Sequence, residues 1–237
     1  MEDNAKIVLI GNPNVGKSVI FGFLTGRYVT VSNYPGTTVE ISTGKAKFDD
    51  STEEVIDTPG VNSLMPYSED EKVTRDILLK ECPRLVIQVA DAKNLRRALF
   101  LSVQLAEMKI PFILNMMDEA RSRGVSLDRE QLEEILGVSA VETVAIHGQG
   151  LMNLVDEIRD SLKVSKLDFD YPEEIEFGIS EITQFLPSSW MAKRALALML
   201  LAGDVSLKEW LRQNLDSFAV QKIETIREEV QAKLQES

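Results

Sequence analysis

The chain has 237 residues, 44% of them hydrophobic and 27% charged, an ordinary globular composition that argues against disorder and suits one medium domain with a small second one. Its formal net charge of -12 disfavours a broad surface for nucleic acid or anionic membrane, because such surfaces depend on clustered Lys and Arg. Cys82 is the only cysteine and His147 the only histidine, so the sequence excludes an internal disulfide and a Cys/His metal cluster.

The N-terminal stretch shows no secretory signal, since it lacks a basic region followed by an apolar stretch and a cleavage site. The longest apolar run, from Ala195 to Ala202, is far shorter than the roughly 20 residues that span a bilayer. We therefore expect the chain as given to be soluble and to suit a reducing, intracellular compartment.

Short apolar runs alternate with helical stretches up to about Lys163. Continuous apolar runs are typical of strands buried on both faces of a parallel sheet. Such strands are predicted at residues 7–10, 85–89 and 111–114, with a weaker one at 143–146. Helices are predicted from about Lys17 and at residues 68–79, 95–108 and 151–162. Strand and helix in repetition predict an α/β fold with a mostly parallel sheet over residues 1–163.

Two segments interrupt this alternation. Residues 39–48 and 53–56 flank the polar turn 49–52 and predict a β-hairpin. One antiparallel edge on an otherwise parallel sheet is a common arrangement. Ser68 and Glu71 form a capping-box pattern at the start of the helix that follows the hairpin.

The pattern changes after Lys163. Residues 164–174 are polar and predict a linker, and no strand-like run follows them. We expect a small all-helical domain over residues 175–237, in which Ser206 and Glu209 form a second capping-box pattern. Its helices are predicted at residues 175–186, 188–202, 206–215 and 217–236.

A phosphate-binding loop follows the first predicted strand and precedes the first predicted helix. The stretch Gly11-Asn12-Pro13-Asn14-Val15-Gly16-Lys17-Ser18 matches the pattern G-x-x-x-x-G-K-[ST] in full. Glycines in such a loop let successive backbone N–H groups face phosphate oxygens, and the positive end of the following helix adds to the attraction. Lys17 is expected to reach the β- and γ-phosphates, and the Ser18 hydroxyl to bind Mg²⁺.

A second phosphate-site element is predicted at Asp57-Thr58-Pro59-Gly60, which follows the apolar strand end of the hairpin. Asp57 is expected to hold Mg²⁺ through water, and the Gly60 amide to meet the γ-phosphate. Thr37 and Thr38 stand in the connection before the hairpin, where a threonine can close over Mg²⁺ and the γ-phosphate. We favour Thr38, because it lies next to the strand that begins at Val39.

The nucleotide base is predicted to be guanine. Asn115-Met116-Met117-Asp118 follows the third parallel strand, and the Asp118 carboxylate can accept from N1–H and the 2-amino group of guanine while Asn115 orients the ring. Adenine lacks both donors on that edge, so the site should discriminate against ATP. The backbone of Val144-Ala145-Ile146 is expected in the last base-contacting loop, with the Ala145 N–H meeting the guanine carbonyl.

Val61 follows Gly60, at the position where many signalling GTPases place a glutamine that orients the attacking water. Valine cannot do this. Three interpretations stay open: slow hydrolysis, a water placed by backbone groups and a bound cation, or a site completed by a partner protein.

These segments together resemble the cytosolic N-terminal region of the bacterial ferrous iron transporter FeoB. The stretches that carry the resemblance are GNPNVGKS, NYPGTTVE, DTPGVNSLMPYSEDEKVTRDIL and NMMDEARSRG, in that order. Met116 adds to it, since most GTPases have Lys there and this family tolerates Met. The resemblance covers roughly residues 5–163 with specific motifs, and the helical remainder by position and composition.

The resemblance implies a P-loop GTPase domain followed by a helical domain of the kind that inhibits guanine-nucleotide dissociation. It implies GTP and GDP as ligands, a membrane-spanning remainder, and a place on the cytoplasmic face of the inner membrane, where hydrolysis regulates or drives Fe²⁺ uptake. The family is similar to potassium-stimulated GTPases, so Asn14 is expected to hold K⁺ beside the phosphates. Lys17, Thr38, Gly60 and Asn14 are then the expected catalytic residues. No nucleic-acid partner is expected, and a homo-oligomer stays open.

Two departures from the usual pattern predict weak nucleotide affinity, nearer micromolar than picomolar, with fast GDP release. Val144 replaces the serine usual before alanine in the base-contacting loop, and Met116 removes a lysine stem that packs over the base. Two other function classes compete: a soluble GTPase of RNA maturation or ribosome assembly, which the acidic charge and helical tail disfavour, and a switch or scaffold that binds GTP without useful hydrolysis.

Overall fold

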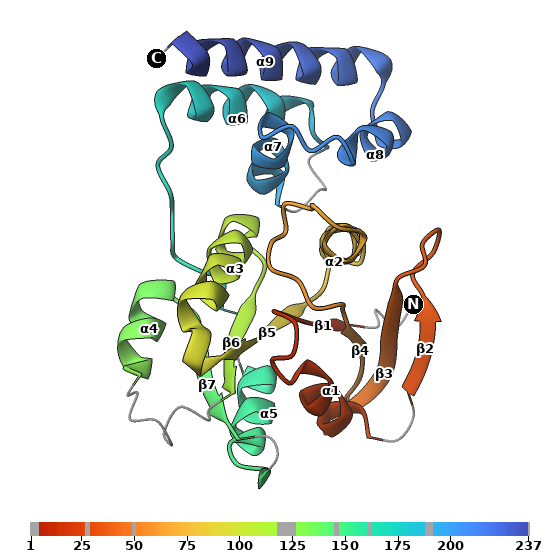
Figure 1. The fold of residues 1–237 in the computed structure, drawn as a ribbon, viewed down its shortest axis with the longest axis vertical. Helices are drawn as coiled ribbons and strands as arrows, with labels where there is room; N and C mark the ends of the chain where they lie inside the picture. Colours follow the sequence, from red (N-terminus) through yellow and green to blue (C-terminus); the bar gives the residue numbers. More distant parts are fainter. Residues whose placement is uncertain are drawn as a thin grey trace. The chain divides into compact units, whose positions relative to one another are not determined.

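The computed structural model describes residues 5–26, 29–48, 51–117, 127–144, 147–160, 163–187 and 192–236. The chain divides into two compact units, Met1–Leu167 and Asp168–Ser237 (Figure 1). The division falls inside the segment 164–174 that was predicted as a linker.

In the described part of the first unit, seven strands form one sheet in the order β2-β3-β4-β1-β5-β6-β7. Their bounds are β1 (Lys6–Gly11), β2 (Val29–Asn33), β3 (Glu40–Phe48), β4 (Ser51–Asp57), β5 (Leu85–Asp91), β6 (Phe112–Met117) and β7 (Ser139–Thr143). The strands from β4 to β7 in this order run parallel, while β3 pairs antiparallel with both β2 and β4. The predicted α/β fold and the hairpin are confirmed.

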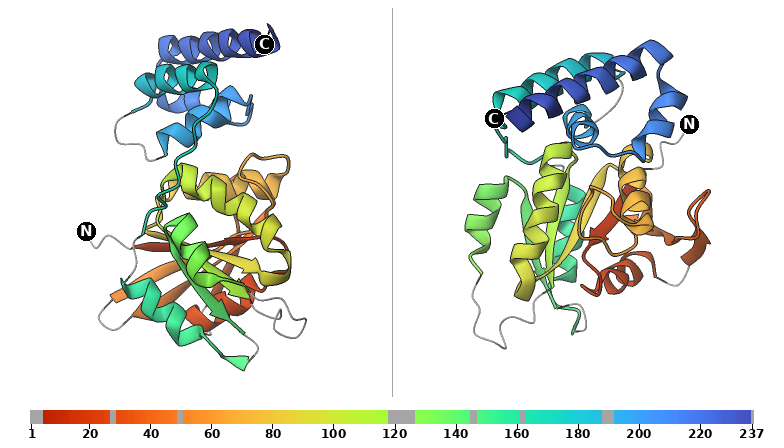
Figure 2. Two further views of the ribbon diagram at one scale, coloured as in Figure 1. Left: turned by 90° about the vertical axis from the view of Figure 1, so that its left-hand side faces the viewer. Right: turned by 45° about the horizontal axis from the view of Figure 1, so that its top comes forward.

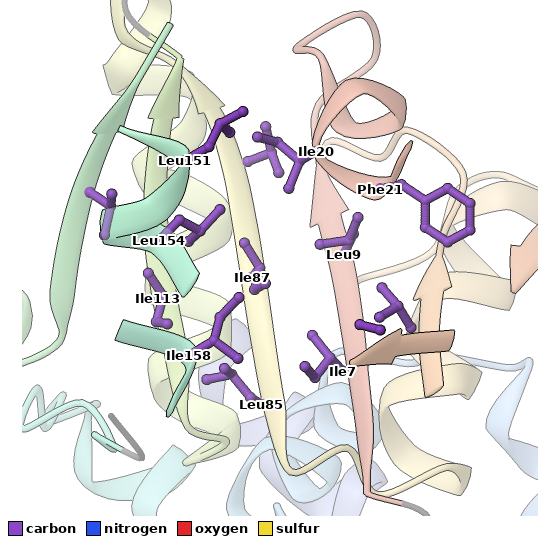
Figure 3. Packing of buried hydrophobic residues seen from close by; sticks show 14 of the residues in the cluster. Ile7, Leu9, Ile20, Phe21, Leu85, Ile87, Ile113, Leu151, Leu154 and Ile158 are labelled. Carbon is purple, nitrogen blue, oxygen red and sulfur yellow. The ribbon is translucent and has the colours of Figure 1, made fainter. Parts of the chain in front are cut away.

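Helices cover both faces of the sheet. Their bounds are α1 (Lys17–Thr25), α2 (Glu69–Lys80), α3 (Leu95–Met108), α4 (Arg129–Leu136) and α5 (Leu151–Asp160). α1 and α5 lie on one face, and α2 and α3 on the other (Figures 1 and 2). Between the sheet and the first pair, fully buried side chains of β1 and β5 meet those of α1 and α5, among them Leu9, Ile87, Ile20 and Leu154 (Figure 3). This apolar layer holds the ends of β1 and β5 rigidly in place.

Several local predictions are confirmed and three segments differ. The Ser68 side chain accepts from the Glu71 N–H at 3.2 Å and caps α2, as the capping-box pattern predicts. The weak strand expected at 143–146 is wrong: β7 ends at Thr143, because its pairing with β6 runs from Ile113↔Ser139 to Met117↔Thr143. α4 and β2 were not predicted. All five residues of β2 are exposed, and its only apolar residues, Val29 and Val31, are too few to indicate a strand by themselves.

The second unit is all-helical in its described residues, as predicted. It contains α6 (Glu173–Phe185), α7 (Lys193–Leu201), α8 (Leu207–Asn214) and α9 (Ser217–Glu236). The capping box expected at α8 is wrong: the Ser206 side chain makes no capping bond, and its hydroxyl donates instead to the Asp204 carboxylate, a charged and stronger acceptor. Throughout the described residues, each helix is too short or too polar to cross a membrane.

Candidate nucleotide site

The phosphate loop joins β1 to α1 at the carboxyl edge of the parallel strands, where ligands of open α/β sheets bind. Two of its residues have positive φ, Asn14 at 64° and Gly16 at 90°. The left-handed backbone turns N–H groups to the same side, which forms an anion-binding concavity. Gly16 is the N-cap of α1 and supplies no side-chain cap, so the first N–H groups of the helix stay available to a phosphate.

Lys17, Ser18 and Asp57 come together below this loop, as the sequence predicts. Asp57 ends β4, which pairs with β1, and its Oδ2 accepts from the Ser18 hydroxyl at 3.2 Å. Its other oxygen, Oδ1, lies 3.9 Å from Lys17 Nζ. The side chains of Lys17 and Asp57 are only 10% and 11% exposed, so water screens these charges poorly.

The ionised forms of both side chains are disfavoured in this conformation. Burial raises the pKa of Asp57 above its ordinary 3.8, opposed by Lys17 and by the Ser18 hydrogen bond. Burial likewise lowers the pKa of Lys17, opposed by Asp57. The attraction between Lys17 and Asp57 at 3.9 Å therefore offsets only part of the cost of burying the two charges. Further charged ligands, such as a phosphate and a cation, would stabilise the ionised forms.

The donor set suits Mg²⁺. Asp57 Oδ1 is buried and has no hydrogen-bond partner among the described residues, and an orphaned buried oxygen is costly unless something binds it. Carboxylate and hydroxyl oxygens are the ligands that Mg²⁺ prefers, usually with waters and substrate phosphates completing the shell. Ser18 and Asp57 therefore fit the cation they were predicted to hold.

The start of the following segment packs directly on the phosphate loop. A Cβ at Gly60 would lie 2.7 Å from Pro13 Cα, so only glycine permits this approach. The Val61 N–H donates to Gly11 O at 2.9 Å, and its side chain is 1% exposed within the core. Val61 therefore cannot contact an attacking water with its side chain. Thr58, which the sequence analysis did not assign, anchors the segment because its hydroxyl donates to Leu9 O at 2.8 Å.

The turn between β2 and β3 distinguishes the two candidate threonines. The Thr37 hydroxyl donates to Tyr34 O at 2.9 Å and accepts from the Val39 N–H at 3.2 Å. Thr38 is exposed, and its hydroxyl has no protein partner within the described residues. Thr37 is thus occupied in closing the turn, and Thr38 is the threonine whose hydroxyl is free to bind a cation.

Thr38 lies outside the strand pairing that ends at Asp57. Ser42 of β3 pairs with Asp57, and Thr38 stands four residues earlier, in a bend before β3 begins at Glu40. That Thr38 closes over a cation held by Asp57 stays a prediction.

Tyr34 of the same turn lies beside α2. It is half-buried, and burial together with the carboxylates of Asp76 and Glu81 raises its pKa to about 12. Asp76 belongs to α2 and Glu81 is its C-cap residue. The turn that carries Thr37 and Thr38 therefore lies close to α2 in this conformation.

On the base side, the structure describes part of the predicted set. Asn115 at the end of β6 is fully buried, its Nδ2 donates to Thr143 Oγ1 at 3.1 Å, and its Oδ1 has no partner among the described residues. Thr143, missed by the sequence analysis, thus orients the asparagine. Met116 is fully buried, on the opposite face of β6 from Asn115. Its predicted contact with the base stays a prediction.

The remaining base-contacting residues are only partly described. Asp118, Ala145 and Ile146 lie outside the described residues. Val144 forms a narrow bridge with Gln149, and its carbonyl accepts from the His147 N–H at 2.9 Å. Val15 of the phosphate loop is 9% exposed and packs in the core behind the loop.

The sheet is mostly parallel, with a phosphate loop after β1, an aspartate at the end of β4 and an asparagine near the end of β6. This arrangement defines a P-loop GTPase fold. Family models identify the group. The model described as "Ferrous iron transport protein B" matches residues 5–158, and the one described as "FeoB cytosolic helical domain" matches residues 171–237. The chain belongs to the ferrous iron transport protein B family.

Relatives and solved structures agree with this assignment. The chain is 38% identical over 221 residues to the Fe(2+) transport protein A/Fe(2+) transporter FeoB fusion protein of Porphyromonas gingivalis, covering 87% of this chain and 26% of that protein. It is 34% identical over 230 residues to the Fe(2+) transporter FeoB of Staphylococcus aureus strain MSSA476, covering 94% and 34% respectively. The chain thus spans about a quarter to a third of the length of these relatives.

Two solved structures match nearly the whole chain. The apo cytosolic domain of the T. maritima FeoB iron transporter has a TM-score of 0.77 at 35% identity, covering 95% of this chain and 97% of that one. A mutant of S. thermophilus NFeoB bound to GDP has a TM-score of 0.80 at 34% identity, covering 98% and 91%. These matches do not favour a GTPase of RNA maturation or ribosome assembly.

Proposed function

We propose that this chain is the GTP-binding and GTP-hydrolysing cytosolic region of a ferrous iron transporter, in which the state of the nucleotide regulates or drives Fe²⁺ uptake across the inner membrane. The observation that carries the nucleotide part is the buried, unpartnered Asp57 Oδ1 beside Lys17 and Ser18, directly below the phosphate loop. GDP bound to the S. thermophilus relative supports guanine nucleotide as the ligand. The transport part rests on the relatives' names, because this chain spans only part of them.

We assign each residue of the site a separate role. Backbone N–H groups of Gly11–Ser18 and the Lys17 ammonium bind the phosphates. Ser18 and Asp57 would hold Mg²⁺, which would neutralise charge that develops on the phosphate oxygens. Gly60 N–H and Thr38 meet the γ-phosphate once the turn has closed. Water then attacks the γ-phosphorus and the bond to the bridging oxygen breaks. GDP leaves with that electron pair, and the γ-phosphoryl group leaves as inorganic phosphate with the oxygen and both protons of the water.

Base selection is assigned to Asn115, Asp118 and the backbone of 144–146. The unpartnered Asn115 Oδ1 supports this, since a base bound there can satisfy it. With valine at position 144 and methionine at position 116, we infer micromolar affinity and fast GDP release.

The reaction also needs a group that compensates for Val61. We infer that K⁺ held by Asn14 supplies positive charge at the phosphates and that backbone groups place the water. Asn14 has a left-handed backbone, with φ of 64°, and is exposed, so its side chain is open to a cation from solvent. Within the described residues, no group of three or more His, Cys, Asp or Glu could hold a metal.

Phosphate release from GTP, measured in K⁺ and in Na⁺ buffer with Mg²⁺, tests this proposal. We expect turnover that K⁺ stimulates, and we expect Asn14→Ala to abolish the K⁺ effect alone. Lys17→Ala provides the background rate, since it removes the phosphate-binding ammonium. GTP binding without turnover in either cation would favour a switch or scaffold that does not hydrolyse GTP.

A further inference from the structure

α3 presents two polar side chains to switch II, which we define as residues 60–67. Arg97 Nη2 donates to Asn62 Oδ1 at 2.8 Å. Gln104 uses both ends of its carboxamide: Oε1 accepts from the Leu64 N–H at 2.8 Å, and Nε2 donates to Ser63 Oγ at 3.1 Å. Seven residues separate Arg97 from Gln104, which is about two helical turns, so both lie on the same face of α3.

The phosphate loop holds switch II from the other side. Asn12 Nδ2 donates to Asn62 Oδ1 at 3.1 Å and to Val61 O, also at 3.1 Å. Asn62 Oδ1 thus accepts from Asn12 and from Arg97. Together with the bond from the Val61 N–H to Gly11 O, these contacts fix the switch II backbone between the phosphate loop and α3.

We propose that Arg97 and Gln104 are positioning residues for GTP hydrolysis, which hold the switch II backbone in place of the missing glutamine side chain at position 61. This inference rests on the proposed GTPase function. The Val61 side chain is buried, and the Val61 N–H and C=O bond with the phosphate loop. At Gly60, the backbone N–H can donate to the γ-phosphate and the backbone C=O can accept from the water. Such dipoles assist a reaction to the extent that they are already oriented, and their orientation depends on what fastens the backbone.

The two contacts suit this role better than a general structural one. Arg97 is exposed, so truncating it opens no cavity in the core. Gln104 bonds with the Ser63 side chain and with the Leu64 backbone amide. These two bonds fix where switch II lies as well as how deeply it is buried. Both residues act through switch II, and neither is assigned a contact with the nucleotide.

The test compares Arg97→Ala and Gln104→Ala with Arg96→Ala in the full chain. Arg96 is an exposed arginine of the same helix whose side chain has no hydrogen bond among the described residues, so it is a matched control for charge. We expect kcat for GTP to fall about three- to tenfold in each of the first two variants, because each loses one or two hydrogen bonds. KM and GDP affinity should stay close to those of the unchanged protein, the melting temperature should fall by only a few degrees in Arg97→Ala and Gln104→Ala, and Arg96→Ala should match the unchanged protein throughout.

Gln104→Glu provides a rescue, since a carboxylate can still accept from the Leu64 N–H and from the Ser63 hydroxyl. It should recover most of the lost kcat. A second readout is amide hydrogen exchange of residues 61–64 in the nucleotide-free protein, which should speed up in Arg97→Ala and Gln104→Ala.

The inference is overturned if kcat is unchanged or raised in both alanine variants, if KM rises instead, or if Arg96→Ala shows the same loss. Absence of turnover in the unchanged protein would reject the proposed function. In that case exchange alone decides the inference: unaltered protection of residues 61–64 rejects it, and faster exchange confined to the two alanine variants supports it.

Discussion

Replacing Thr37 and Thr38 separately by valine should separate the stability of the β2–β3 turn from its chemistry. Valine keeps the branched Cβ and removes only the hydroxyl. The Thr37 hydroxyl makes two hydrogen bonds that close the turn, to Tyr34 O and from the Val39 N–H. The Thr38 hydroxyl makes none within the described residues, so the two variants differ in what they remove.

The expected magnitudes follow from these bonds. A neutral hydrogen bond contributes about 0.5–1.5 kcal/mol, so Thr37→Val should lower the free energy of unfolding by about 1–3 kcal/mol. For a protein of this size, that corresponds to a melting temperature lower by roughly 2–12 °C. Thr38→Val should change the free energy of unfolding by less than about 0.5 kcal/mol, as expected of an exposed substitution.

Turnover should show the reverse order. Thr38→Val removes the hydroxyl that is to meet Mg²⁺ and the γ-phosphate, so kcat should fall by about two orders of magnitude with GDP affinity unchanged. Thr37→Val should hydrolyse GTP within about threefold of the unchanged protein. Thermal unfolding and phosphate release measure the two effects. Loss of turnover in Thr37→Val with normal turnover in Thr38→Val would reverse the assignment, and an unchanged melting temperature in Thr37→Val would refute the role of its hydroxyl.

Three further predictions concern charge. Burial raises the pKa of Asp57 above 3.8, so the native state binds the Asp57 proton more tightly than the unfolded state does. The free energy of unfolding should therefore fall as pH rises from 3.8 through the raised pKa, and Asp57→Asn should lack this fall. Denaturant titrations at several pH values measure the fall, and Mg²⁺ binding should be lost on acidification. Asp118→Asn should weaken GTP binding at least about tenfold and favour xanthosine triphosphate, whose 2-carbonyl accepts from the new amide, as a competition assay would show. The pKa of Glu176 is lowered to about 2, chiefly by the hydrogen bond that Arg194 donates to it. The Glu176–Arg194 pair therefore contributes to the free energy of unfolding above pH 4.5, and this contribution is lost as pH falls towards 2. Helicity followed during acid titration should show that loss in the unchanged protein and not in Arg194→Gln.

Much of the fold could be predicted from local patterns. The continuous apolar runs of β1, β5 and β6 and the periodicity of α3 and α5 indicated their elements, because a strand buried on both faces and an amphipathic helix each leave a distinct spacing of apolar residues. β2 offered only two alternating valines in a short strand that is exposed on both faces, which is too little to indicate a strand. β7 was misplaced because residues 144 and 146 are more apolar than most of the strand itself, while pairing with β6 decides where the strand ends.

The sequence by itself determined the phosphate loop, the aspartate of β4 and the asparagine of β6, since each stands at or near the carboxyl end of a buried strand. Only the tertiary structure decided that Thr37 closes a turn, that Thr143 orients Asn115, and that Arg97 and Gln104 hold switch II. Except for the local bonds of Thr37, those contacts join residues that are 28 to 41 positions from each other in the sequence. The physical reason is strand order. The spacing of apolar residues within a segment indicates which of its faces is buried. It does not indicate that β1 lies between β4 and β5, which brings switch II, after β4, beside α3, after β5.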